Sequence, residues 1–195
     1  PASLSARGHR DTPADLVRDL ESPDAWWRTR ARRLLLERRD ATAAPALAAA
    51  ATNAASAEAR AAALWALHTL GELSAATVTR ALRDASAGVR EQALQLAEPR
   101  LSGSPELTTA VLAVAADPDA RVRFVAALIL GSVADPRAVP ALATIATRDG
   151  TDRWTRAAVL SGVGGRMAEF LTAMTQATPR QPDAFAAVME DLGRS

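Results

Sequence analysis

The stretches DASAGVR at residues 84–90 and DPDARVR at residues 117–123 decide the fold, because they are two copies of one pattern. Each begins with Asp at a turn and ends in Val-Arg. A turn Asp can accept the free backbone N–H groups at the start of a helix, and Pro is tolerated just inside the helix. We therefore predict that a helix begins in each stretch, capped by Asp84 or Asp117. We expect its Val to face the core and its Arg to reach an Asp or a carbonyl of an adjacent repeat.

The arginine of this pattern recurs along the chain with spacings of 32, 30, 33 and 33 residues. Its five positions are Arg28, Arg60, Arg90, Arg123 and Arg156. The third residue after each Arg is small or β-branched, and we expect two of these residues, Ala93 and Ala126, to be buried in the seam between helices. A fixed period of this length is typical of stacked helical repeats, whose terminal units depart from the pattern.

Each unit divides into two predicted helices, separated by Gly or Pro. The first helices are predicted over residues 24–39, 57–70, 87–98, 119–131 and 152–163. The second helices are predicted over residues 42–52, 74–83, 105–116, 136–147 and 166–177, with a cap helix over residues 182–192. The fold class is therefore all-α, a right-handed α-solenoid of about five helical hairpins.

The repeat array is predicted to cover residues 22–178. Its units are 22–54, 55–83, 84–116, 117–149 and 150–178. Residues 1–21 are interpreted as an N-terminal linker and the start of the first helix, and residues 179–195 as a C-terminal cap or tail. The polar stretch 1–12, which contains His9, is interpreted as linker or disorder.

Composition narrows the possible functions. The chain has no Cys, which excludes a disulfide, a thiolate metal site and a cysteine nucleophile in these 195 residues. The 23 basic and 22 acidic residues nearly balance, so no nucleic-acid partner is expected. Two isolated His make no metal site. We expect no cofactor, no metal and no catalytic residue, and no apolar run approaches the length of a membrane span.

A period near 33 with the pattern D-x-x-x-x-V-R resembles HEAT repeats, in particular the short variety also found in phycobilin lyases. A narrower resemblance rests on WWRTRARRLL at residues 26–35, ALWALHTLG at 63–71, DASAGVREQALQLAE at 84–98 and DRWTRAAVLS at 152–161. In this order they resemble the HEAT segment of large bacterial membrane-bound dehydrogenase proteins, between a β-propeller and a c-type cytochrome domain. The resemblance implies a spacer in an exported, periplasmic or cell-envelope protein. The propeller and the C-x-x-C-H motif are absent here, so no catalytic or haem-binding residue carries over.

Four aromatic residues are candidates for contact with a partner. Trp26 and Trp154 occupy the same repeat position, two before the Arg, and are either partner anchors or bulky residues that close the ends of an Ala-lined stack. Trp65 and His68 lie three residues apart on one helix face, where they either line a groove or pack between units. For all four residues the structural interpretation is favoured.

The second helices supply the remaining candidates, Thr108 and Thr144. They belong to a neutral, Thr-rich set that we expect to be exposed on a concave docking surface. Its members are Thr77, Arg80, Thr108, Thr109, Thr144, Thr147, Thr172 and Gln176.

These observations favour a non-catalytic scaffold, a protein-interaction module or a spacer, with a protein or a neighbouring domain of the same polypeptide as its partner. Two alternatives stay open. One is a DNA-binding HEAT protein of the alkylpurine glycosylase type, and the other is a chromophore lyase subunit.

Overall fold

The computed structural model describes residues 11–177 and 181–193. Within these ranges the chain forms helices joined by turns and contains no strand, which confirms the all-α prediction. Residues 1–10 of the expected linker, His9 among them, lie outside the described residues, as do 178–180 and 194–195. The chain divides into two compact units, residues 1–81 and 82–195. The right-handed solenoid expected for the whole array stays a prediction.

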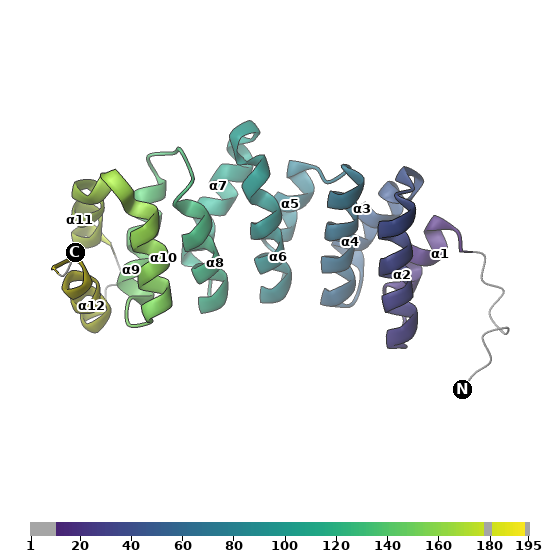
Figure 1. Cartoon of the computed structure of the whole chain (residues 1–195), viewed down its shortest axis with the longest axis horizontal. Coiled ribbons are helices and arrows are strands. Elements are labelled where there is room, and N and C mark those ends of the chain that lie inside the picture. Colours follow the sequence, from purple (N-terminus) through teal and green to yellow (C-terminus); the bar gives the residue numbers. More distant parts are fainter. Residues whose placement is uncertain (1–10, 178–180, 194–195) are drawn as a thin grey trace. The chain divides into compact units, whose positions relative to one another are not determined.

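The first unit contains five α-helices and a 3-10 helix among its described residues. They are α1 (Pro13–Asp19), α2 (Ala25–Arg38), a 3-10 helix (Ala41–Ala43), α3 (Ala44–Asn53), α4 (Ala57–Leu70) and α5 (Ala75–Ala81). Helix α2 packs beside α4, while α1, α3 and α5 form a second row behind them (Figure 1). The most extensive contact joins α3 to α4, and hence the two rows.

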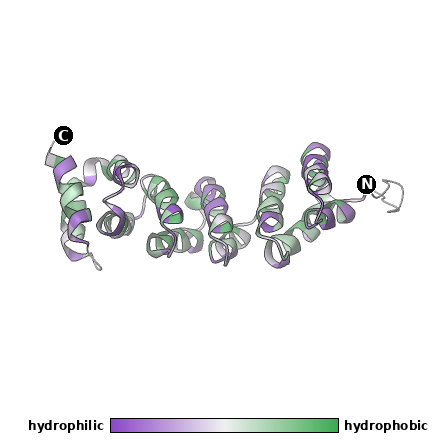
Figure 2. Ribbon diagram, turned by 90° about the horizontal axis from the view of Figure 1, so that it is seen from below, coloured by the Kyte–Doolittle hydropathy of each residue, from purple (hydrophilic) through white to green (hydrophobic). Residues whose placement is uncertain are grey.

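The second unit repeats this arrangement. Its α-helices are α6 (Ala87–Ala97), α7 (Pro105–Ala113), α8 (Ala120–Leu130), α9 (Ala138–Asp149), α10 (Arg153–Val163), α11 (Met167–Gln176) and α12 (Pro182–Gly193). Its 3-10 helices cover Glu98–Gly103, Val114–Ala116 and Gly164–Arg166. Helices α6, α8 and α10 form one row and α7, α9 and α11 the other (Figure 1). Figure 2, which is seen from below, shows the two rows with the helices viewed along their axes. Helix α12 packs on α9.

The first helices begin where the sequence places them, because each follows a Ser or Asp in an extended conformation. These N-cap residues are Asp24, Ser56, Ser86, Asp119 and Asp152. All except Ser86 accept a hydrogen bond from a backbone N–H of the first turn, which satisfies a donor that has no partner within the helix. The observed ends of the five first helices agree with the predicted ones to within one residue.

Helix α1 corrects the expected N-terminal boundary. The sequence assigns residues 13–19 to a linker that leads into the first helix, whereas the structure makes them a separate helix. Thr12 caps it by accepting a hydrogen bond from the Asp15 N–H at 3.2 Å, and Pro13 occupies its first position. Leu16 and Leu20 are each 1% exposed, so this short helix is held by its apolar side against the rest of the first unit.

The seam between neighbouring helices is lined by small residues. Ala31, Ala63, Ala93 and Ala126, each three residues after the repeated Arg, are completely buried. This confirms the burial predicted for Ala93 and Ala126. A methyl group at these positions allows the adjacent helix to pack closely, and a larger side chain would not fit, because protein interiors are close-packed.

Replacing Ala93 or Ala126 with Leu is therefore expected to destabilise the protein by about 1–3 kcal/mol, because the added atoms must displace a packed neighbour. Urea unfolding followed by circular dichroism measures the change. The matched control is Ala157→Leu, at an exposed position of α10. Equal midpoints for the buried and exposed variants would contradict the packing described for the seam.

Candidate functional site

The repeated arginine is the most regular polar feature of both units. In every case it is the fourth residue of a first helix, and its Nη1 donates to the carbonyls six and five residues earlier, in the preceding turn. The first of these two distances lies between 2.6 and 2.8 Å for Arg28, Arg60, Arg90, Arg123 and Arg156. The Arg thus closes the turn that leads into its own helix by satisfying carbonyls that no helix bonds.

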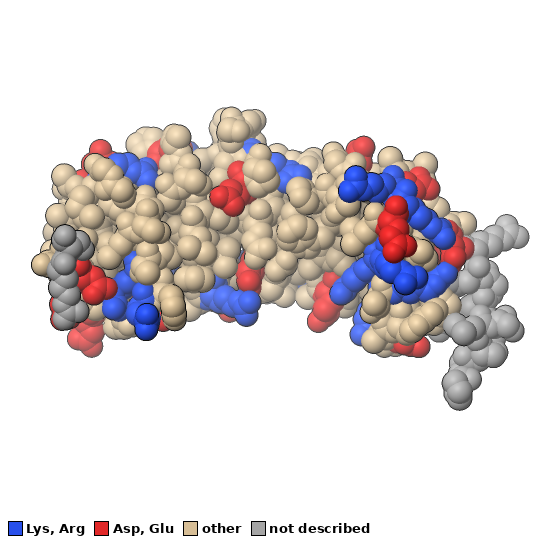
Figure 3. All heavy atoms as spheres, viewed as in Figure 1, with Lys and Arg blue, Asp and Glu red and all other residues tan. Residues whose placement is uncertain are grey.

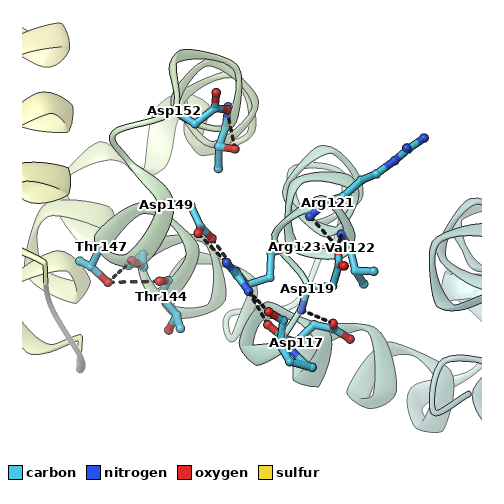
Figure 4. Close-up of polar contacts among 12 residues, drawn as sticks. Asp117, Asp119, Arg121, Val122, Arg123, Thr144, Thr147, Asp149 and Asp152 are labelled. Carbon is cyan, nitrogen blue, oxygen red and sulfur yellow. Dashed lines mark hydrogen bonds and ion pairs between the residues drawn. The ribbon is translucent and has the colours of Figure 1, made fainter. Parts of the chain in front are cut away.

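In the second unit the other side of the guanidinium pairs with a carboxylate farther along the chain. We call these three pairs the Arg–Asp ladder: Arg90–Asp117, Arg123–Asp149 and Arg156–Asp191, with closest distances of 2.7, 2.5 and 2.7 Å. In the first two pairs Nε and Nη2 each bond one carboxylate oxygen, the two-pronged geometry that suits Arg. Figure 4 shows Arg123 between Asp149 at the end of α9 and the backbone at Asp117. The ladder confirms that Arg90 reaches an Asp of the adjacent repeat, Asp117. Arg123 instead pairs with Asp149, the last residue of its own predicted unit, so the adjacent-repeat prediction is wrong for Arg123.

Asp84 and Asp117 do not themselves cap the helices, which corrects the sequence interpretation. The N-cap residues of α6 and α8 are Ser86 and Asp119. Asp84 and Asp117 accept a hydrogen bond from the backbone N–H of those two residues, at 2.8 and 2.9 Å. They therefore shape the turn one step before the helix, a local bond typical of Asp.

The Asp117 carboxyl is held ionised by its surroundings. Burial alone would raise its pKa, but hydrogen bonds from Arg90 and the Asp119 N–H, with the charges of Arg90 and Arg123, outweigh burial and lower the pKa. A carboxyl whose pKa is lower in the folded state contributes stability above its unfolded pKa, and this is lost as the pH falls through the folded value.

We therefore expect the stability difference between the parent and Asp117→Asn to depend on pH. The parent is more stable at pH 6, and its advantage shrinks as the pH falls below the ordinary pKa of an unfolded Asp, about 3.9, because Asp117 binds a proton more readily in the unfolded chain than in the folded protein. Urea unfolding of both proteins at several pH values measures this difference. A difference that stays constant down to pH 2.5 would show that the Asp117 charge contributes nothing.

The aromatic candidates of the first unit lie on its first helices. The Trp26 and Trp27 rings meet edge to face at 4.7 Å, and the Arg30 guanidinium lies within 6 Å of both. Trp26 is 52% exposed. On α4, Trp65 and His68 also meet edge to face at 5.7 Å, which confirms that they share a helix face. Edge-to-face pairs of this kind are favourable packing contacts in their own right.

The candidates of the second unit do not form one site. Trp154 lies on α10, in the first row, whereas Thr108 on α7 and Thr144 on α9 belong to the second row. The Thr108 and Thr144 hydroxyls donate to carbonyls of their own segment, Ser104 at 3.1 Å and Pro140 at 3.0 Å. Thr147 is completely buried and donates to the Ala143 carbonyl. Its expected exposure is therefore wrong, because the side chain lies on the packed side of α9.

An open groove of about 580 Å³ adjoins Trp154 in the second unit. We call it the α8–α10 groove, after the helices that form its walls. Its lining residues are Ala120, Arg121, Phe124, Arg148, Asp149, Thr151, Asp152, Trp154, Thr155 and Gln181. Trp154 is 61% exposed, and the Arg153 guanidinium lies 4.5 Å from the centre of its ring. Of the predicted site residues, only Trp154 lines this groove.

The part of the chain that the structure describes contains no cluster of three His, Cys, Asp or Glu side chains that could hold a metal ion. No helix in the described ranges combines the length and the apolar character needed to cross a membrane.

Comparison with known proteins identifies the repeat type for part of the chain. The family model for HEAT repeats matches residues 74–164. No curated protein matches the sequence. The matched range runs from the start of α5 to the end of α10. It contains both residues of two pairs of the Arg–Asp ladder, Arg90–Asp117 and Arg123–Asp149. It supports a HEAT-like helical repeat protein.

Proposed function

We propose that this chain is a non-catalytic HEAT-like scaffold that binds another protein, or a neighbouring domain of its own polypeptide, through the face of its second unit formed by α6, α8 and α10. The observation that carries the proposal is the exposure of Trp154 beside an open groove, on a framework whose arginines bond backbone and carboxylates. Exposed aromatic side chains beside a cleft are typical of protein contact sites.

Surface charge supports the same proposal. In the second unit, the face formed by α6, α8 and α10 is largely uncharged in its middle, and charged side chains gather toward its edges (Figure 3). Leu128 on this face is 53% exposed. An uncharged centre with a charged rim is the usual composition of a protein–protein interface.

The larger multidomain protein to which this chain would belong is a second part of the proposal. The four stretches quoted above support a position between a propeller dehydrogenase domain and a cytochrome c domain. The reading frame around the coding segment tests this. A propeller sequence upstream and a C-x-x-C-H motif downstream would support it, and a frame that encodes neither would contradict it.

Photo-crosslinking tests the binding function directly, because a chain without Cys accepts a single introduced thiol. Thr151→Cys places a benzophenone label at the groove, and Ala49→Cys places one on an exposed position of α3. We expect a defined protein from an extract of the producing cells to crosslink at position 151 and to be displaced by unlabelled chain. Crosslinking at neither position, or crosslinking that unlabelled chain does not displace, would contradict the proposal.

A further inference from the structure

The walls of the α8–α10 groove present aromatic surface on two sides. Trp154 begins the α10 wall and is mostly exposed, while Phe124 on the α8 wall is half-buried. The stacked Arg153 guanidinium restrains the indole, since a cation over a Trp ring is attracted to its face. An apolar side chain that enters between these rings would remove aromatic surface from water. Because the Trp154 ring is already restrained, little side-chain entropy would be lost in this step.

The two carboxylates of the groove are already engaged within the protein. Asp149 accepts two hydrogen bonds from Arg123, whose side chain is 4% exposed. Asp152 caps α10 and accepts from the Thr155 N–H at 2.7 Å and from the Thr155 hydroxyl at 2.9 Å. Both carboxylates are therefore already supplied with hydrogen-bond donors from within the protein.

The arginines of the groove form fewer bonds within the protein than its carboxylates do. Arg121 is 77% exposed at its side chain and reaches Glu91 at 2.9 Å, an exposed pair of the kind that contributes little. Arg148 has no hydrogen bond or ion pair with residues 11–177 or 181–193. The groove thus offers an unpaired guanidinium beside aromatic surface, and this combination favours a ligand that is both anionic and apolar.

We propose that the α8–α10 groove binds a short acidic peptide segment of a partner protein, with an apolar side chain between Trp154 and Phe124 and a carboxylate on Arg148. The inference rests on the proposed binding function and adds the site and the chemistry of the partner. Arg148 and the adjacent rings supply a charged contact and a desolvated anchor, the two kinds of contact that dominate small interfaces.

Charge also argues for a peptide over a nucleic acid. Glu91, Asp149 and Asp152 lie in or beside the groove, and a strand with one phosphate per nucleotide would pass close to them. A peptide can instead place a single carboxylate at Arg148 and keep its other residues neutral.

Selection from a phage-displayed library of random heptapeptides on the full chain tests the inference. We expect enriched peptides to carry Asp or Glu next to an aromatic or aliphatic residue. The most enriched peptide, synthesised with a fluorescein label, should bind at least tenfold more weakly to Trp154→Ala and to Arg148→Gln. Rising salt should also weaken it, because charge contributes to binding.

Matched control variants separate this inference from the proposed function. Trp26→Ala removes the Trp at the same repeat position of α2, and Arg83→Gln removes an exposed Arg that does not line the groove. Both should bind the peptide as the parent does. If acidic peptides bind but respond to the controls instead of the groove variants, the binding function stands and this site is wrong. If no peptide is enriched, or if a labelled dT20 strand displaces the peptide from the groove, the inference fails.

Discussion

Replacing Arg123 with Ala is expected to lower the free energy of unfolding by about 3–5 kcal/mol, because it leaves buried groups without their partner. Arg123 is 4% exposed and Asp149 is 14% exposed at the side chain. The variant loses both hydrogen bonds to Asp149 and the bonds to the carbonyls of Asp117 and Pro118. The bond to the Asp117 carbonyl is buried and the other three are partly buried, so water replaces the lost bonds only in part in the folded state.

The measurement is urea unfolding beside two comparison variants. Arg33→Ala removes an Arg that is 67% exposed and lies 3.6 Å from Glu37, and should cost no more than about 1 kcal/mol. Arg38 is a poorer control, since its Nη1 donates to the Asp11 carbonyl at 2.6 Å. Arg123→Lys keeps the charge but cannot form the two-pronged contact, and should fall between parent and Ala variant. Equal midpoints for Arg123→Ala and Arg33→Ala would show that the ladder does not hold the second unit together.

The register of the repeats could be read from the sequence because its signals are local. The position of each Arg within its helix, the Ser or Asp that precedes the helix and the small residue three positions after the Arg all follow from one turn of chain. For this reason the first helices begin at the predicted residues. The same locality explains the exchange of roles between Asp117 and Asp119, because either carboxylate could cap α8.

Features that join distant segments were not predictable in this way. Arg156 pairs with Asp191, 35 residues later, instead of with a carboxylate at the interval of 27 or 26 residues seen for Arg90 and Arg123. The α8–α10 groove combines the start of α8, the end of α9, the start of α10 and Gln181. Phe124 and Arg148 carry no signal in the sequence that sets them apart from other residues of the array. Only the packing of the helices makes them neighbours.

A pair of facing glycines is a further nonlocal feature, and it gives the second large expected effect. Gly131 is the C-cap residue that follows α8, and Gly162 lies in α10. A Cβ on Gly131 would lie 2.6 Å from the Cα of Gly162, and one on Gly162 would lie 2.7 Å from the Cα of Gly131. Gly131 has an ordinary helical conformation, with φ −59° and ψ −33°. The close approach of α8 to α10, and not backbone conformation, therefore requires a residue without a side chain.

Gly131→Val is expected to destabilise the protein by about 3 kcal/mol, the upper end of the usual range for overpacking, because the obstacle is backbone and cannot rotate away. Gly131→Ala should cause a smaller loss in the same direction. Gly88→Ala is the matched control, since its Cβ would meet only the Ser86 hydroxyl at 3.7 Å. That change should stabilise α6 by up to about 1 kcal/mol, because Ala favours the helix over Gly. Thermal unfolding of the three variants measures the contrast. A Gly131→Ala variant that gains stability as Gly88→Ala does would show that α8 and α10 are not in contact at this point.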